Sequence, residues 1–200
     1  MNIHLLIMEM ARKADQNKVQ RLKQSTMKLV VERGFGGASA ALISKDAQVA
    51  SGYFYMHYAG KYEMVNSILH EVYNEVLIRF EDLVQDGYSF WETVEKIARH
   101  FIDIANTEPV KIKFLYVLTN DYSFLLDQKI KKNTYRIINR LLKMGQESGE
   151  LDENISDDDL YLIMLATIFQ YINLHFKRNE TKIQEKDTKH LLYLIQKLLK

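Results

Sequence analysis

The sequence has no cysteine, one proline and only eight glycines among its 200 residues. The lack of cysteine excludes a disulfide framework, a thiolate zinc site, an iron–sulfur cluster and a cysteine nucleophile. A β-sandwich or β-barrel needs turn residues roughly every 8 to 12 positions, which this chain does not supply. With 47% apolar residues, the chain is still long enough to bury a sizeable core. The composition therefore predicts an all-α protein built from long helices.

Long apolar runs are also missing. A membrane-spanning helix needs about 20 mostly apolar residues, whereas the most hydrophobic stretch, Leu160–Tyr171, is shorter and contains Thr167 and Gln170. The apolar start, Met1–Met10, has neither the positive region nor the small-residue cleavage site of a signal peptide. We therefore expect no membrane partner and a cytoplasmic location.

The formal net charge is only +1, which taken alone argues against a nucleic-acid partner. The charge is unevenly distributed, however. Residues 1–66 hold 9 Lys and Arg against 5 Asp and Glu, a net charge of +4, whereas residues 67–200 hold 18 against 21, a net charge of −3. A basic N-terminal part joined to an acidic remainder favours DNA binding at one end of the chain.

Helical periodicity divides the first third of the chain into an N-terminal arm, residues 1–16, and a compact unit, residues 17–66. Gly34 is expected to end the first helix of this unit. The short link between the second and third helices, Ala47–Ala50, has the length of a helix-turn-helix turn. The predicted helices cover residues 17–33, 39–47, 51–58 and 61–83.

Residues 67–200 are predicted to form a second, helical domain. Pro109 suits a first helical turn, and Ser156 followed by three aspartates is typical of a capped helix start. The helix after Ser156 is apolar on every side, and the last helix, 185–199, has a large apolar face. We therefore expect these last two helices to form half of a four-helix bundle with a second subunit; the alternative is that they cap a monomer core. Other helices are predicted over 89–106, 109–118 and 122–144.

Glycine, aromatic and hydroxyl residues recur at fixed spacings between positions 34 and 65. They are Gly34, Phe35, Ser39, Ile43, Ala47, Val49, Gly52, Tyr55, His57, Tyr58, Lys61 and Met64. These residues and spacings resemble the DNA-binding region of the TetR family of bacterial transcriptional regulators. The sequence departs from that pattern at Ser44, Gln48 and Ala50. Gln48 must then adopt a turn conformation that glycine adopts at lower cost, and Ser51 is expected to take over helix capping from Ala50.

The resemblance implies an N-terminal helix-turn-helix domain that binds double-stranded DNA, with its third helix in the major groove. By the same resemblance, phosphate contacts come from Ser39, Tyr55, His57 and Lys61, and base contacts from Ser51, Gly52 and Tyr53. Lys45 is a further candidate for a phosphate or base contact. Phe54 and Tyr58 are expected to pack in the interior, and a buried structural role is the alternative for His57.

For residues 67–200 the resemblance implies only architecture, namely a variable helical domain that binds an inducer and dimerises. Large apolar residues on the central helices are candidates for the pocket wall, with ordinary core packing as the alternative for each. Asn120 and His175 are further polar groups that would orient a ligand. Few charges lie near this set, which favours an apolar or aromatic inducer. The candidates are Trp91, His100, Phe101, Phe114, Tyr116, Phe124, Met164 and Phe169.

Motifs for catalysis are missing. There is no glycine-rich phosphate loop with its lysine, and the six histidines never fall into the Glu-x-x-His pattern of a di-iron site. We therefore expect no enzyme activity, no cofactor and no metal. The leading hypothesis is a homodimeric repressor that binds a pseudo-palindromic operator and is released by a small-molecule inducer. The alternative is a helical protein-interaction or ligand-binding module that does not bind DNA.

Overall fold

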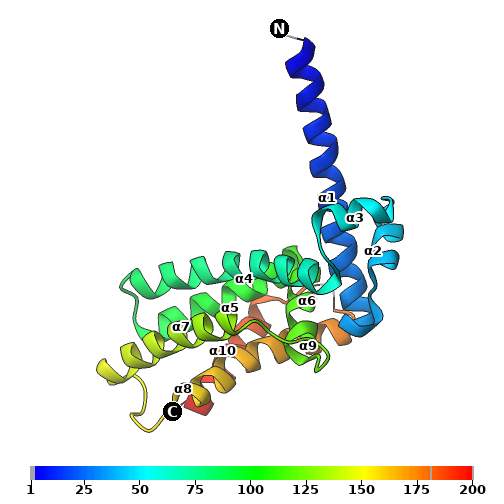
Figure 1. Ribbon diagram of the computed structural model, residues 1–200. Helices are drawn as coiled ribbons and strands as arrows, with labels where there is room; N and C mark the ends of the chain where they lie inside the picture. The colour runs from blue at the N-terminus through cyan, green and yellow to red at the C-terminus, as the bar shows by residue number, and fades with distance from the viewer. Residues whose placement is uncertain (1–2, 181, 200) are drawn as a thin grey trace. The chain divides into compact units, whose positions relative to one another are not determined.

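The computed structural model describes residues 3–180 and 182–199, and within these ranges the chain consists of helices and turns without a β-strand (Figure 1). The predicted all-α fold is confirmed. The chain divides into an N-terminal unit, Met1–His70 with Val117–Leu125, and a C-terminal unit, Glu71–Tyr116 with Leu126–Lys200. Among the described residues, no helix combines the length and the apolar character needed to cross a membrane.

Three helices in the predicted order open the N-terminal unit. The long helix α1 (Ile3–Gly37) includes most of the segment that the sequence suggested as a separate arm. Its regular conformation breaks at Gly34, where φ is 70° and ψ is 172°, a combination that is costly for any residue with a side chain. Helices α2 (Ala40–Asp46) and α3 (Ser51–His57) follow, and α4 (Lys61–Gln85) begins in this unit.

The turn between α2 and α3 departs from ordinary backbone geometry. Gln48 has a positive φ of 55°, the left-handed conformation expected for a residue that replaces glycine at this place. The prediction that Ser51 caps α3 is wrong. Ala50 is the N-cap residue and Ser51 is already helical, so no side chain satisfies the first N–H groups of α3. Helix α3 therefore depends on packing against its neighbours.

A small apolar core supplies that packing. Phe54 is the buried residue of α3, as the sequence predicted, and its ring lies 5.9 Å from that of Tyr58. The buried Thr26 of α1 donates its hydroxyl proton to the carbonyl oxygen of Leu22 at 2.8 Å, so its polar group is satisfied. The fully buried apolar residues around these are Leu22, Val30, Ile43, Phe54, Met64 and Val65.

Most helices of the C-terminal unit begin where the sequence predicted. Ser89 and Ser156 both form capping boxes, with Glu92 and Asp159 respectively, and the hydrogen bonds from each serine lower the pKa of its partner carboxyl. The helices are α5 (Phe90–Thr107), α6 (Pro109–Asn120), α7 (Gln128–Glu147), α8 (Asp157–Leu160), the π-helical segment η1 (Tyr161–Ala166), α9 (Thr167–Lys177) and α10 (Glu185–Leu199).

One helix start was predicted wrongly. The sequence pattern placed a helix over residues 122–144, but α7 begins only at Gln128. Asp127 caps it, with its carboxylate accepting a hydrogen bond from the Lys129 N–H at 2.7 Å. Residues 121–125 leave the helical path and pack within the N-terminal unit instead.

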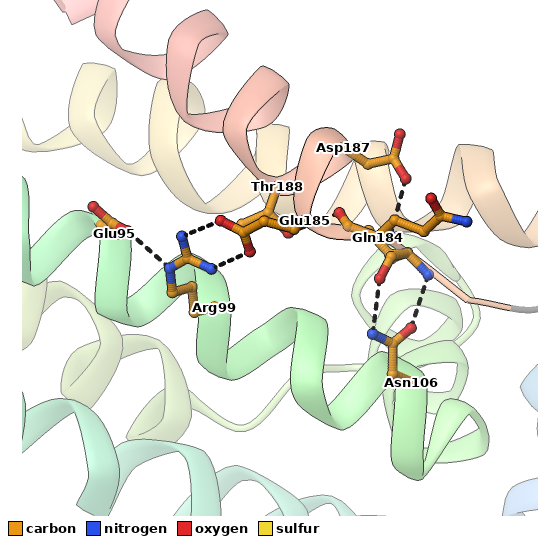
Figure 2. Close-up of polar contacts among 8 residues, drawn as sticks. Glu95, Arg99, Asn106, Gln184, Glu185, Asp187 and Thr188 are labelled. Atoms are coloured by element: carbon orange, nitrogen blue, oxygen red, sulfur yellow. Dashed lines mark hydrogen bonds and ion pairs between the residues drawn. The ribbon is translucent and has the colours of Figure 1, made fainter.

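Polar contacts fix the start of α10 against α5 (Figure 2). The Arg99 guanidinium donates two parallel hydrogen bonds to the Glu185 carboxylate, at 2.7 and 2.8 Å, and a third to Glu95. About two turns further along α5, the Asn106 amide exchanges two hydrogen bonds with the backbone of Ile183. Because Ile183 is buried, Asn106 satisfies backbone groups that water does not reach.

Replacing Asn106 by alanine is expected to lower the free energy of unfolding of the C-terminal unit by about 2 to 4 kcal/mol. The substitution leaves the N–H and the carbonyl of Ile183 without partners, and each buried unpaired group costs about 1 to 3 kcal/mol. Chemical denaturation measures the loss. Thr107→Ala is the matched control, because its exposed hydroxyl bonds only within its own helix; equal losses for the two variants would contradict the expectation.

Candidate nucleic-acid interface and ligand domain

Helix α3 presents most of its surface to solvent. Ser51, Gly52, Tyr55 and His57 are all exposed, which excludes the alternative of a buried His57. A Cβ atom added at Gly52 would meet nothing within 4 Å, so a partner can approach the backbone closely there. Met56, to which the sequence analysis gave no role, is 79% exposed. The face opposite Phe54 is thus free to contact a large ligand.

Tyr53 is held from outside its own helix. Its hydroxyl donates to the side-chain oxygen Oδ1 of Asp15 on α1, at 2.6 Å, and lies 3.0 Å from the backbone oxygen of the same residue. Its ring lies 4.6 Å from that of His57, and the Lys18 ammonium lies 5.2 Å from the ring centre. Desolvation and the Asp15 hydrogen bond raise the pKa of Tyr53 to about 12. Asp15 is 38 positions away, and no local pattern pointed to it.

The two candidate phosphate contacts on α2 lie at its ends. The Ser39 hydroxyl caps the helix by accepting a hydrogen bond from the Leu42 N–H at 3.2 Å. Lys45 is in the last turn and is exposed. Between them, the buried hydroxyl of Ser44 has no hydrogen-bond partner among the described residues, at a position where the pattern in similar sequences has alanine.

Lys61 is engaged within the unit. Its ammonium donates to the backbone oxygen of Phe35 at 2.6 Å and lies 4.1 Å from the centre of the Phe35 ring. The Phe35 N–H donates in turn to the Asp121 carboxylate at 2.8 Å, and Phe124 packs its ring 5.0 Å from that of Phe35. Phe124, a candidate for the ligand pocket, therefore packs within the N-terminal unit, whereas the other candidates belong to the C-terminal unit.

Asp121 is expected to make the N-terminal unit sensitive to acid. Hydrogen bonds from Ser123 and Phe35, together with the charge of Lys61, hold the pKa of Asp121 below its ordinary value near 3.8. A lowered pKa in the folded state adds stability that is fully present above about pH 4 and is lost as the pH falls through the folded value. Asp121→Asn should therefore cost about 1 kcal/mol at pH 7 and weaken the pH dependence below pH 4.

Thermal denaturation from pH 2.5 to 7, followed by a probe in the N-terminal unit, checks this expectation. Asp152→Asn is a suitable control, because the pKa of Asp152 is also lowered but by Asn154, within the C-terminal unit. If the stability of the N-terminal unit depends on pH in the same way in Asp121→Asn and in the wild type, Asp121 does not cause the acid sensitivity.

The remaining ligand candidates lie in the C-terminal unit. Phe101, Phe114 and Met164 are fully buried, and the ring of Phe169 lies 4.8 Å from that of Phe101. Trp91 and Tyr116 are partly exposed, and the Tyr116 hydroxyl donates to Gln170.

His100 differs from these apolar neighbours. Its Nε2 atom is buried and has no hydrogen-bond partner among the described residues, while its ring lies 6.2 Å from that of Phe80. Desolvation, reinforced by the Arg79 charge, lowers the pKa of His100, so the ring is neutral at pH 7. A neutral imidazole nitrogen in an apolar core can form one hydrogen bond with a ligand.

An open pocket of about 770 Å³ lies elsewhere in the C-terminal unit, between α9 and α10. None of the eight ligand candidates lines it, but His175 does. The His175 Nδ1 atom is bonded to the Tyr171 carbonyl at 3.0 Å, and its Nε2 atom lies 3.3 Å from Glu180. The side chain is thus already engaged inside the fold.

Comparison with known proteins gives a family match that lies within the N-terminal unit. A family model described as bacterial regulatory proteins of the tetR family matches residues 24–68, which include all of α2 and α3. Residues 24–68 thus carry the DNA-binding region that the tetR family model describes. The matched segment contains the whole pattern from Gly34 to Met64, so the resemblance predicted from the sequence is confirmed. The protein is a DNA-binding transcriptional regulator similar to those that this family model describes.

Several known regulators match most of the chain. The Fatty acid metabolism regulator protein of Bacillus subtilis is 24% identical over 72% of this chain and 75% of its own. A TetR-family regulator from Marinobacter aquaeolei superposes with a TM-score of 0.76, at 18% identity, over 94% of this chain and 98% of its own. FadR from Bacillus subtilis, solved with stearoyl-CoA, gives a TM-score of 0.72 at 17% identity over 90% and 97%. At these identities, the structures establish a shared fold.

Proposed function

We propose that this protein is a repressor that binds a pseudo-palindromic operator as a homodimer and leaves it when a small apolar molecule binds the C-terminal unit. The observation that carries the proposal is the exposed surface of α3, anchored from behind by Phe54. The net charge of +4 over residues 1–66 supports contact with phosphates. The predicted contacts Ser39, Lys45, Tyr55 and His57 are all exposed and accessible to a duplex.

Exposed apolar side chains support dimerisation through the last helices. Leu162 of η1, Leu174 of α9, and Tyr193 and Leu198 of α10 are each more than 40% exposed. Large apolar groups on neighbouring elements of a small domain favour a protein partner. A second copy of the chain would bury them and set the distance between the two α3 helices, which must match half-sites about one DNA turn apart or a multiple of it.

A long acyl chain is the ligand class that we propose. The names of two relatives, a fatty acid metabolism regulator and a FadR solved with stearoyl-CoA, support it. In this chain, Phe101, Met164 and Phe169 would surround the acyl chain, and the free Nε2 of His100 would bond its polar end. Such a regulator acts by binding alone, in the cytoplasm, and needs neither a metal nor catalysis.

Selection of duplexes from a random pool tests the DNA-binding part. We expect enrichment of one sequence with two-fold symmetry and an affinity that falls steeply with salt. Titration of stearoyl-CoA into the protein–operator complex then tests the ligand, with coenzyme A lacking the acyl chain as the control. Release by both compounds alike would contradict recognition of the acyl chain, and failure to enrich any duplex at low salt would contradict the DNA-binding role.

A further inference from the structure

The contact between Tyr53 and Asp15 constrains the proton of the Tyr53 hydroxyl. The two oxygens of Asp15 that surround this hydroxyl, Oδ1 at 2.6 Å and the backbone oxygen at 3.0 Å, are both hydrogen-bond acceptors. An ionised carboxylate has no proton to donate. The Tyr53 hydroxyl must therefore be the donor, and its single proton is committed to Asp15.

A committed proton limits what Tyr53 can recognise. A phenol oxygen that has donated its proton still has lone pairs, so it can accept a hydrogen bond but not donate one. In the major groove, adenine and cytosine present amino groups as donors, whereas guanine O6 and N7 and thymine O4 are acceptors. A tyrosine oxygen held in this way can accept a hydrogen bond from adenine or cytosine, whereas the acceptor atoms of guanine and thymine repel it.

We infer that Asp15 is a specificity-determining residue, because it holds the Tyr53 proton and thereby makes Tyr53 select adenine or cytosine in the DNA strand that it faces. The inference rests on the proposed operator binding through α3. Asp15 itself need not touch DNA, since it acts by orienting Tyr53. The surroundings fix the ring as well, because it lies 4.6 Å from the His57 ring and 5.2 Å from the Lys18 ammonium.

The charge of Asp15 adds to the effect. A carboxylate next to a recognition helix repels phosphates and therefore opposes non-specific DNA binding. The Lys18 ammonium, near the same Tyr53 ring, partly offsets this repulsion. Asp15 thus lowers the affinity for DNA of any sequence, and it also fixes Tyr53 as a hydrogen-bond acceptor. Together these effects favour discrimination between DNA sequences over tight binding to any duplex.

Site selection with three proteins tests the inference: the wild type, Asp15→Asn and Tyr53→Phe. The amide of asparagine can donate to the Tyr53 oxygen, which removes the shorter of the two contacts that hold the hydroxyl proton. The backbone oxygen at 3.0 Å then competes with a base for this proton. We expect Asp15→Asn to change the preferred base at one position of each half-site from adenine or cytosine to guanine or thymine. Tyr53→Phe should remove the preference at that same position. A preference carried by one neutral hydrogen bond is about fivefold.

Glu9→Gln is the matched control, because it removes the same charge from an exposed position of the same helix. It should select the wild-type sequence at every position. Suppose that the wild type enriches an operator. If Asp15→Asn then selects the same base at every position, or changes a position that Tyr53→Phe does not affect, the inference is wrong. Operator binding would stand in either case. If the wild type enriches no duplex, operator binding fails and the inference fails with it.

Discussion

Replacing Phe54 by alanine is expected to abolish operator binding while the C-terminal unit stays folded. Helix α3 has seven residues, no side-chain cap and one buried side chain, and so short a helix is not stable alone. Truncating a fully buried phenylalanine costs about 3 to 5 kcal/mol. This loss approaches the whole folding free energy of a small domain. The recognition surface would therefore lose its fixed shape.

Hydrogen exchange measured segment by segment, together with operator titration, checks this expectation. Amides of residues 40–65 should lose protection, whereas those of α5 and α10 should keep it. Met56→Ala is the control on the same helix, because Met56 is mostly exposed and its truncation should change stability by less than about 0.5 kcal/mol. Unchanged protection of α3 in Phe54→Ala would show that other contacts hold the helix.

A second large effect is expected at the proposed subunit interface. The double substitution Leu174→Glu with Leu198→Glu should convert the dimer to a monomer. Each chain would otherwise bury two unpaired carboxylates in an apolar interface. The fold of the single chain should survive, since both side chains are exposed in it. A monomer binds one half-site only, so operator affinity should fall by about 100-fold or more.

Analytical ultracentrifugation reports the change in mass, and titrations of a full operator and of an isolated half-site report its effect on DNA binding. Half-site affinity should be unchanged. Ile78→Glu serves as the control, because Ile78 is an equally exposed apolar residue on α4 of the same unit. A dimer that withstands the Leu174 and Leu198 substitutions would place the interface elsewhere.

Structural features that depend on neighbouring residues in the chain could be predicted from the sequence. The cap at Ser156 was recognisable because the residues involved lie within three positions of each other. Gln48 was predictable for the same reason, since one residue had to make a turn usually made by glycine. These are features of local backbone geometry, which neighbouring residues in the sequence determine.

Contacts between distant positions could not be predicted. Asp15 reaches Tyr53 and Asp121 reaches Phe35 only after α1 and α6 are in place, and nothing in the sequence around either aspartate marks it as a partner. The start of α7 was missed because residues 122–127 contain no proline or glycine, and tertiary packing of Phe124 on Phe35 outweighs their helical pattern. Tertiary contacts decided each of these cases.

The π-helical segment η1 explains why the sequence around it looked apolar on every side. Leu160, Met164, Ile168 and Ile172 are fully buried and strictly four residues apart. In a regular α-helix each four-residue step turns by 400°, so three steps would rotate the last side chain about 120° away from the first. A π-turn accommodates one extra residue and cancels most of that rotation. Leu162 and Leu174, which lie twelve positions apart, are both exposed. Deleting a single residue from Tyr161–Ala166 would restore a regular helix and turn every side chain of α9 by about 100° relative to α8.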